Sequence, residues 1–127
     1  MRVFKTKVFA GIARKWNMGD AVLWRAAAQA DGGLMEADLG GEVIQQRLGR
    51  AADGKPSGFR TFTFLRPGIR AVFVHGLATN ERTVPRRDEM SALWKLAKLM
   101  LSYTNEEIAM ALHAGALIEV MDDQTIS

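Results

Sequence analysis

The chain contains no cysteine among its 127 residues. This absence excludes a disulfide framework, a thiolate zinc site and a thiol nucleophile. It also favours a reducing compartment, so we expect a cytoplasmic protein. No uninterrupted apolar segment approaches the roughly 18 residues of a membrane-spanning helix, and the opening residues MRVFKTKVFAG lack the apolar block of a secretory leader.

The patterns of metal and nucleotide sites are also missing. The two histidines, His75 and His113, have no Asp, Glu or His at ligand spacing, so we expect no metal site. Residues 49–55, GRAADGK, match the first seven positions of a phosphate-binding P-loop, but Pro56 stands where a hydroxyl would bind magnesium. A predicted strand, rather than a helix with its amides toward the phosphates, follows this loop. We therefore expect neither a nucleotide nor any other cofactor.

Acidic residues are scarce in the middle of the chain. Residues 47–87 carry nine basic and two acidic side chains, a local charge of +7, whereas the whole chain has a net charge of +3. A cationic region of this kind attracts phosphate-rich polymers through long-range steering and counterion release. The alternative is that the arginines border a sheet and keep it soluble. The nine basic residues are Arg47, Arg50, Lys55, Arg60, Arg66, Arg70, Arg82, Arg86 and Arg87.

Two runs rich in β-branched and aromatic residues, 59–66 and 70–78, lie within this basic region. Because Pro67-Gly68 between them suits the centre of a tight turn, we predict a β-hairpin. A loop with an even number of residues would place three pairs on one face of the sheet, namely Phe62 opposite Phe73, Phe64 opposite Ala71, and Arg60 opposite His75. A loop with an odd number would break that pairing.

The N-terminal part of the sequence predicts two helices and two further strands. Weak alternation indicates a short strand at residues 2–5, and apolar residues at helical spacing predict a helix over residues 7–16. We expect the carboxylate of Asp20 to cap a second helix over residues 21–30 by accepting the N–H groups of its first turn. Residues 42–48, EVIQQRL, alternate as a strand does.

The C-terminal part predicts two more helices. Apolar residues repeat at helical spacing over residues 90–101. Thr104 and Glu107 form a capping box that begins a final helix, and Gly115 ends it. Together these elements predict an α+β fold, in which an N-terminal helical hairpin and C-terminal helices pack on a small antiparallel β-sheet. We expect one domain over residues 1–121 and a flexible tail over residues 122–127.

Two segments on either side of the predicted turn carry a resemblance. Residues 54–60 read GKPSGFR, and residues 74–82 read VHGLATNER. The sequence resembles the RelE/HigB-like toxins of type II toxin-antitoxin systems, in which K-S-G-G-Y-R precedes a hydrophobic hairpin and F-V-Y-G-F-A-K-N-E-R. The likeness runs from about residue 1 to residue 120.

This resemblance implies a RelE-like fold whose concave basic side enters the ribosome and cuts mRNA, which inhibits translation. It also implies a cognate antitoxin with a helix-turn-helix domain, so that operator DNA is reached only through the antitoxin. Direct DNA binding is the less supported alternative, because no helix of the chain carries an arginine-rich recognition face.

The resemblance also assigns site residues by position. Arg60 matches the strand arginine near the scissile phosphate, Lys55 matches the loop lysine, and the end of the second motif supplies Asn80, Glu81 and Arg82. Three residues depart from the pattern, since Phe59 and His75 replace tyrosines and Thr79 replaces a lysine. A lost cation leaves a second reading open, in which the chain is a catalytically weakened module that binds RNA or the antitoxin.

RNA can be cut without a metal if its own 2′-hydroxyl attacks the adjacent phosphate. We hypothesise that Arg60, helped by Lys55 and Arg82, stabilises the phosphorane, because guanidinium groups stay charged and bind phosphate oxygens through two donors. His75 or Glu81 then transfers a proton. The expected RNA-backbone contacts are Arg47, Arg50, Arg66, Asn80, Arg86 and Arg87.

Overall fold

The computed structural model describes residues 1–49, 58–78 and 85–122. Along the chain the elements are β1 (Arg2–Thr6), α1 (Lys7–Lys15), α2 (Asp20–Asp31), β2 (Ala37–Asp38), β3 (Val43–Gly49), β4 (Gly58–Arg66), β5 (Arg70–Ala78), α3 (Arg87–Leu101), α4 (Asn105–Ala114) and β6 (Leu117–Glu119). The described strands form one sheet in the order β2-β3-β4-β5-β1-β6. All neighbours are antiparallel except β1 and β5, which are parallel. The predicted α+β class is confirmed.

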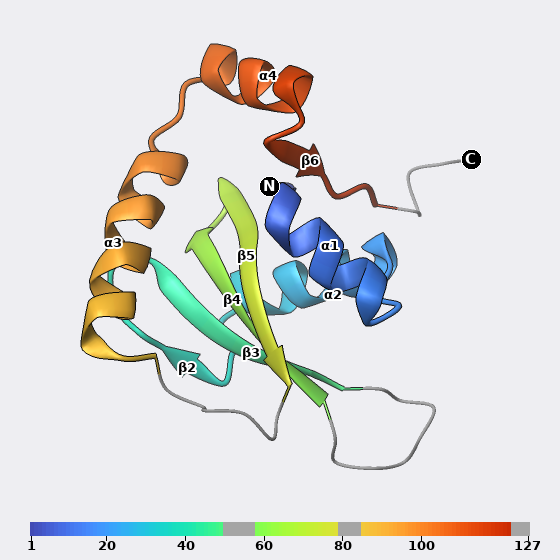
Figure 1. Ribbon diagram of the computed structural model, residues 1–127, viewed down its shortest axis with the longest axis vertical. Helices are drawn as coiled ribbons and strands as arrows, with labels where there is room; N and C mark the ends of the chain where they lie inside the picture. The colour runs from blue at the N-terminus through green and yellow to red at the C-terminus, as the bar shows by residue number, and fades with distance from the viewer. Residues whose placement is uncertain (50–57, 79–84, 123–127) are drawn as a thin grey trace.

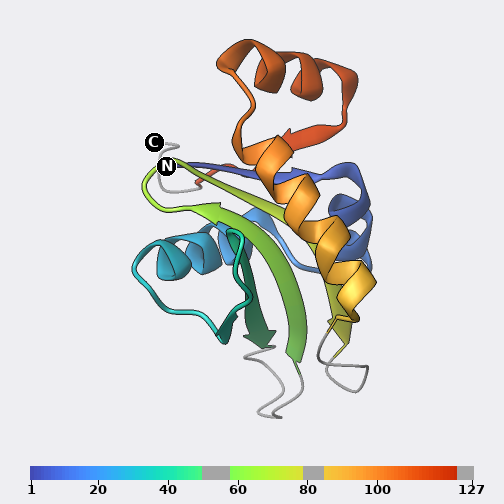
Figure 2. The ribbon, with the colours of Figure 1, turned by 90° about the vertical axis from the view of Figure 1, so that its left-hand side faces the viewer.

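Helices cover both faces of the sheet (Figure 1). α1 and α2 pack on one face, where Phe9 and Leu23 meet Phe73 of β5 in one apolar cluster. α3 crosses the other face, where its Leu101 meets Phe64 of β4 in a second cluster. Figure 2 shows α4 beyond one end of the sheet, next to β6. Because side chains alternate along a strand, β4 and β5 supply both clusters at once.

The predicted cap of α2 is wrong. Gly19 is the N-cap residue, and no side chain caps the helix there. The carboxylate of Asp20, the first residue of α2, instead accepts hydrogen bonds from Lys5 Nζ at 2.9 Å and from the Met121 backbone N–H at 3.2 Å. A charged amine is the stronger donor. Asp20 therefore ties α2 to β1 and to the C-terminal segment.

The predicted hairpin is confirmed as β4 and β5, and its loop has the odd length that breaks the pairing expected for an even loop. Arg66 pairs with Arg70, so an odd number of residues, three, connects the two strands. The observed pairs are Phe62 with His75, Phe64 with Val72, and Arg60 with Leu77, in place of Phe62 with Phe73, Phe64 with Ala71, and Arg60 with His75. The left-handed conformation of Gly68, with φ of 75°, lets the chain reverse within this short loop.

The C-terminal helices agree with their predicted signals. The Thr104 hydroxyl accepts the Glu107 N–H at 3.1 Å, and the Glu107 carboxylate accepts the Thr104 N–H at 2.9 Å, so the capping box is confirmed. Gly115 ends α4 in the left-handed conformation, with φ of 78°. The short strands β2 and β6 were not predicted. No helix within residues 1–49, 58–78 and 85–122 is long and apolar enough to cross a membrane.

Candidate functional site

A β-bulge in β5 sets the direction of His75. The pairing of β5 with β4 shifts by one residue next to Phe62, which pairs with His75, and Val74 becomes the extra residue of β5. Without this shift His75 would pair with Thr61, whose side chain points toward α1 and α2 because its neighbour Phe62 points toward α3. The bulge therefore turns His75 to the α3 side of the sheet.

His75 borders a cleft of about 350 Å³ between the sheet and the first half of α3. The residues lining the cleft are Phe62, His75, Leu77, Pro85, Glu89, Ala92, Leu93 and Leu96. The imidazole is exposed and stacks on Phe62, with the ring centroids 6.0 Å apart and the planes at 20°. A side chain held in this way can accept and donate a proton at the surface while its orientation stays set by the aromatic contact.

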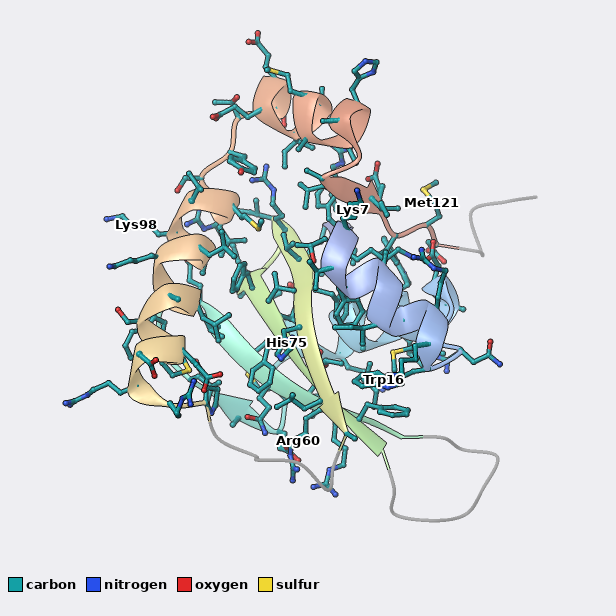
Figure 3. The ribbon with its side chains drawn as sticks, in the orientation of Figure 1. Lys7, Trp16, Arg60, His75, Lys98 and Met121 are labelled. Atoms are coloured by element: carbon teal, nitrogen blue, oxygen red, sulfur yellow. The ribbon has the colours of Figure 1, made fainter. Side chains whose placement is uncertain are left out.

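Arg60 lies on the same face of the sheet as His75, because it precedes Phe62 by two residues on β4. Figure 3 shows the two side chains toward the same end of the sheet. The Nε of Arg60 donates a hydrogen bond to Glu36 Oε1 at 3.0 Å, and 12% of the arginine side chain is exposed. Arg60 is therefore bound to a carboxylate and lies flat against the protein.

Glu36 is the centre of a polar cluster, which we name the Glu36 cluster, consisting of Glu36, Gln45, Arg47 and Arg60. The Oε1 atom of Glu36 also accepts a hydrogen bond from Gln45 Nε2, and Oε2 lies 3.2 Å from Arg47 Nε. The backbone N–H of Glu36 donates to the Gln45 carbonyl at 2.9 Å. Glu36 is thus fixed to the edge of β3 by its main chain and reaches two arginines with its side chain.

The charges around Glu36 keep its carboxyl group ionised. Burial raises the pKa of Glu36, but hydrogen bonds from Gln45 and Arg60 and the positive charges of Arg60 and Arg47 lower it by more. The net shift is downward. A carboxylate with a lowered pKa is a poor proton acceptor near neutral pH. The Glu36 cluster is therefore suited to holding arginines in place rather than to moving protons.

The structure does not bring Arg66 to this group of residues. Arg66 lies at the other end of β4, where its Nε and Nη2 bind the two oxygens of Glu42 at 2.9 Å each. Its Nη1 donates to the Leu101 carbonyl at 2.8 Å, at the end of α3. The Arg70 guanidinium likewise binds the carbonyl oxygens of Met100 and Tyr103. Both arginines hold the C-terminal end of α3 against the sheet.

The other predicted site residues divide into two sets. Arg86 and Arg87 are exposed at the start of α3, and the Arg86 side chain lies within 4 Å of the carboxylates of Asp88 and Glu89. The remaining predicted residues lie outside the described part of the chain, and these are Arg50, Lys55, Asn80, Glu81 and Arg82. The described residues that flank these segments in the sequence, Gly49, Gly58 and Ala78, lie at the end of the sheet that carries Arg60.

Glu36 and Glu42 offset part of the positive charge that the sequence places in residues 47–87. Both glutamates precede residue 47, yet they bind Arg47, Arg60 and Arg66. Reasoning from the sequence missed Glu36, because the strand that fixes it, β2, is two residues long and shows no periodicity. No group of three or more His, Cys, Asp or Glu residues within the described ranges is placed to hold a metal ion.

Comparison with known proteins agrees with the fold. Residues 1–120 match the family described as "RelE toxin of RelE / RelB toxin-antitoxin system". The matched range contains every helix and strand that the structure describes. None of the curated proteins matches the chain significantly.

Proposed function

The chain belongs to the RelE family of toxins, and from this premise we propose that it is an endoribonuclease that cuts mRNA on the ribosome. Membership of the family implies an antitoxin as its partner. We further propose that this antitoxin is of the helix-turn-helix type and neutralises the toxin in the cytoplasm. The observation that carries the proposal is the common placement of Arg60 and His75 on the α3 side of the sheet, at one end of β4 and β5.

The proposed reaction needs no metal and no covalent enzyme intermediate. The 2′-hydroxyl of a ribose loses its proton and attacks the adjacent phosphorus, and the 5′-oxygen of the next nucleotide leaves and takes up a proton. A 2′,3′-cyclic phosphate and a 5′-hydroxyl end result. The protein has to hold the strand in line, stabilise charge on the phosphorane and carry protons.

Arg60 is the proposed partner of the phosphorane, since it is permanently charged and lies on the same face and toward the same end of the sheet as His75. His75 is the proposed proton carrier among the described residues, because its ring is exposed and points to the α3 side. Lys55, Glu81 and Arg82 are proposed to complete the site from residues 50–57 and 79–84. Arg47, Arg50, Asn80, Arg86 and Arg87 are proposed to bind the RNA backbone, and Arg66 is left out because Glu42 and the end of α3 engage it.

A second candidate function rests on the contact between Arg60 and Glu36. A guanidinium that already binds a carboxylate has to exchange or share that contact before it binds phosphate, which costs part of its binding energy. Thr79, where the family pattern has a lysine, removes one more cation. Under this alternative the chain is a RelE-fold module that binds RNA or the antitoxin without cutting.

Expression in a bacterial host separates the two candidates. We expect induction of the wild-type chain to arrest growth and translation, and primer extension to reveal new 5′ ends within mRNA. The Arg60→Ala variant, if it melts as cooperatively as the wild type, is expected to lose at least about 100-fold of the cleavage rate, because a donor aimed at developing charge is removed. A folded Arg60→Ala variant that remains fully toxic would refute the assignment, and a wild-type chain that binds ribosomes without cutting would favour the binding module.

A further inference from the structure

The contact between Glu36 and Arg60 joins the residue before β2 to β4, a strand that is not a neighbour of β2. Glu36 is attached to the edge of β3 next to β2, whereas Arg60 lies on β4, so the ion pair reaches across β3. The guanidinium is planar and carries its five donors in fixed directions. A carboxylate that binds at Nε therefore sets the plane in which the whole group lies.

We propose that Glu36 is a positioning residue for RNA cleavage, which holds the Arg60 guanidinium in the orientation that meets the phosphate. The inference rests on the proposed function, because it concerns the same arginine. The inference adds one requirement to that function. The negative charge of Glu36 must raise the rate of cleavage, although it weakens the electrostatic attraction between the protein and RNA. Preorganised groups stabilise a transition state without the cost of being oriented during the reaction.

Three observations favour positioning over the other roles open to Glu36. The lowered pKa of its carboxyl group argues against a general base. Its side chain is 29% exposed, and ion pairs at this exposure add little to stability. Its carboxylate is held through both oxygens, since Oε1 accepts hydrogen bonds from Gln45 and Arg60 and Oε2 forms an ion pair with Arg47, which fixes it more tightly than a solvated surface glutamate.

The chain supplies a matched control at the other end of the same strands. Glu42 binds Arg66 as Glu36 binds Arg60, and the arginine again comes from β4. The pKa of Glu42 is also lowered, chiefly by the hydrogen bond from Arg66. The two pairs differ in position, since only the Glu36 pair lies at the end of the sheet that carries His75. A substitution at Glu42 therefore reproduces the loss of an ion pair without touching the site.

The test measures single-turnover cleavage of mRNA on programmed ribosomes, with full-length Glu36→Gln, Glu36→Asp and Glu42→Gln proteins. For Glu36→Gln we expect the rate at saturating protein to fall by roughly 10- to 100-fold, as for a reacting group displaced by about 1 Å. The half-saturating protein concentration should stay constant or fall, because one negative charge beside the RNA is removed. Glu36→Asp, which keeps the charge but shortens the side chain, should also lose rate. Glu42→Gln should cleave as the wild type does.

A second measurement follows the arginine itself. The Nε–H resonance of Arg60 in a ¹H–¹⁵N spectrum should be distinct in the wild type and in Glu42→Gln, and should move toward the position of solvated arginines in Glu36→Gln. This measurement needs no cleavage activity, so it also reports on a variant that is stable but inactive. Melting curves of all the proteins establish that each is folded.

The possible outcomes separate this inference from the proposed function. Three outcomes would each overturn the positioning role and leave the proposed function intact. In the first, Glu36→Gln cuts at the wild-type rate, and in the second it loses no more rate than Glu42→Gln does. In the third, it binds ribosomes more weakly while its maximal rate stays unchanged. If Glu36→Gln does not fold, a Glu36→Asp variant with the wild-type rate overturns the role equally. A wild-type chain that binds programmed ribosomes but does not cut defeats the proposed function and this inference together.

Discussion

Gly76 on β5 leaves space for an aromatic stack on the α1 face of the sheet, opposite the face that carries the site. The indole of Trp16 lies on Phe59, with the ring centroids 3.9 Å apart and the planes at 15°. A Cβ atom added to Gly76 would come within 2.7 Å of the indole ring. Because real Cβ contacts are never so short, the indole would have to move and the stack would open.

We expect Gly76→Ala to lower the free energy of unfolding by about 1–3 kcal/mol, the usual cost of overpacking. Gly11→Ala makes the same chemical change within α1, where the nearest atom to the new Cβ lies at 3.9 Å. It should raise the free energy of unfolding by roughly 0.5–1 kcal/mol, because alanine is the better helix former. Urea denaturation of both variants checks the opposite signs, and equal changes would contradict the role of the indole contact.

His75 permits a substitution that keeps the aromatic contact while removing the proton chemistry. The His75→Phe variant retains a ring that can stack on Phe62. We expect its cleavage rate on ribosomes to fall by about 100-fold or more, the usual contribution of a general acid or base. An undiminished rate in a folded His75→Phe protein would remove this histidine from the mechanism and leave Glu81 as the proton carrier.

At the scale of elements, two arginines join the sheet to the end of α3. The Arg70 guanidinium donates to the carbonyl oxygens of Met100 and Leu101, at the end of α3, and of Tyr103 just beyond it. Carbonyl groups at a helix end lack a donor from a following turn of the helix. Burial lowers the pKa of Arg70, and the neighbouring charges of Arg2 and Arg66 lower it further. Keeping a charge at this position is therefore unfavourable by itself, and the carbonyl contacts offset the cost.

We expect Arg70→Met to lower the free energy of unfolding by about 1–3 kcal/mol, because the carbonyl oxygens of Met100, Leu101 and Tyr103 each lose a partly buried hydrogen bond from this guanidinium. Arg86→Met is the matched control, since 63% of the Arg86 side chain is exposed beside Asp88 and Glu89. Its effect should stay within about 0.5 kcal/mol. Thermal melting measures both changes, and similar losses in the two variants would show that Arg70 has no special part in holding α3.

Elements with a strong local signal were predictable from the sequence, and those that depend on distant partners were not. The hairpin, the helices and the Thr104 capping box follow from periodicity and from turn or cap residues. β2 and β6 are two and three residues long, and they exist because a neighbouring strand pairs with them. The cap expected from Asp20 failed for the same reason, since Lys5 and the Met121 amide compete for its carboxylate.

The candidate site shows the same division. The sequence marked Arg60 and His75 as members of one hairpin, but their common face results from a bulge at Val74 that no local pattern announces. Glu36 escaped notice because its partners Gln45 and Arg60 are far from it in the sequence. The sequence alone therefore predicts which arginines belong to the region, whereas the carboxylates that restrain them emerge only from the tertiary fold.

At the scale of the whole molecule, stability should fall in acid. The pKa values of Glu36 and Glu42 are both lower than the ordinary glutamate value in the folded protein. A carboxyl group of this kind stabilises the fold fully above its unfolded-state pKa, about 4.3, and loses that contribution as the pH falls through its folded-state pKa. Because both carboxylates are about one third exposed, we expect only a small drop of the urea midpoint below about pH 4.3, and a smaller one in Glu42→Gln. An identical acid profile in that variant would show that the Glu42 pair adds nothing to stability.

The strand order determines when the β-sheet can form completely during synthesis of the chain. Of the described strands β1 is made first, yet it lies between β5 and β6, which are made last. A growing chain therefore carries its N-terminal strand without a neighbour until residues 70–78 have been translated. Under the proposed function, a nascent chain that ends before Glu119 therefore lacks the complete sheet and should not act as a nuclease.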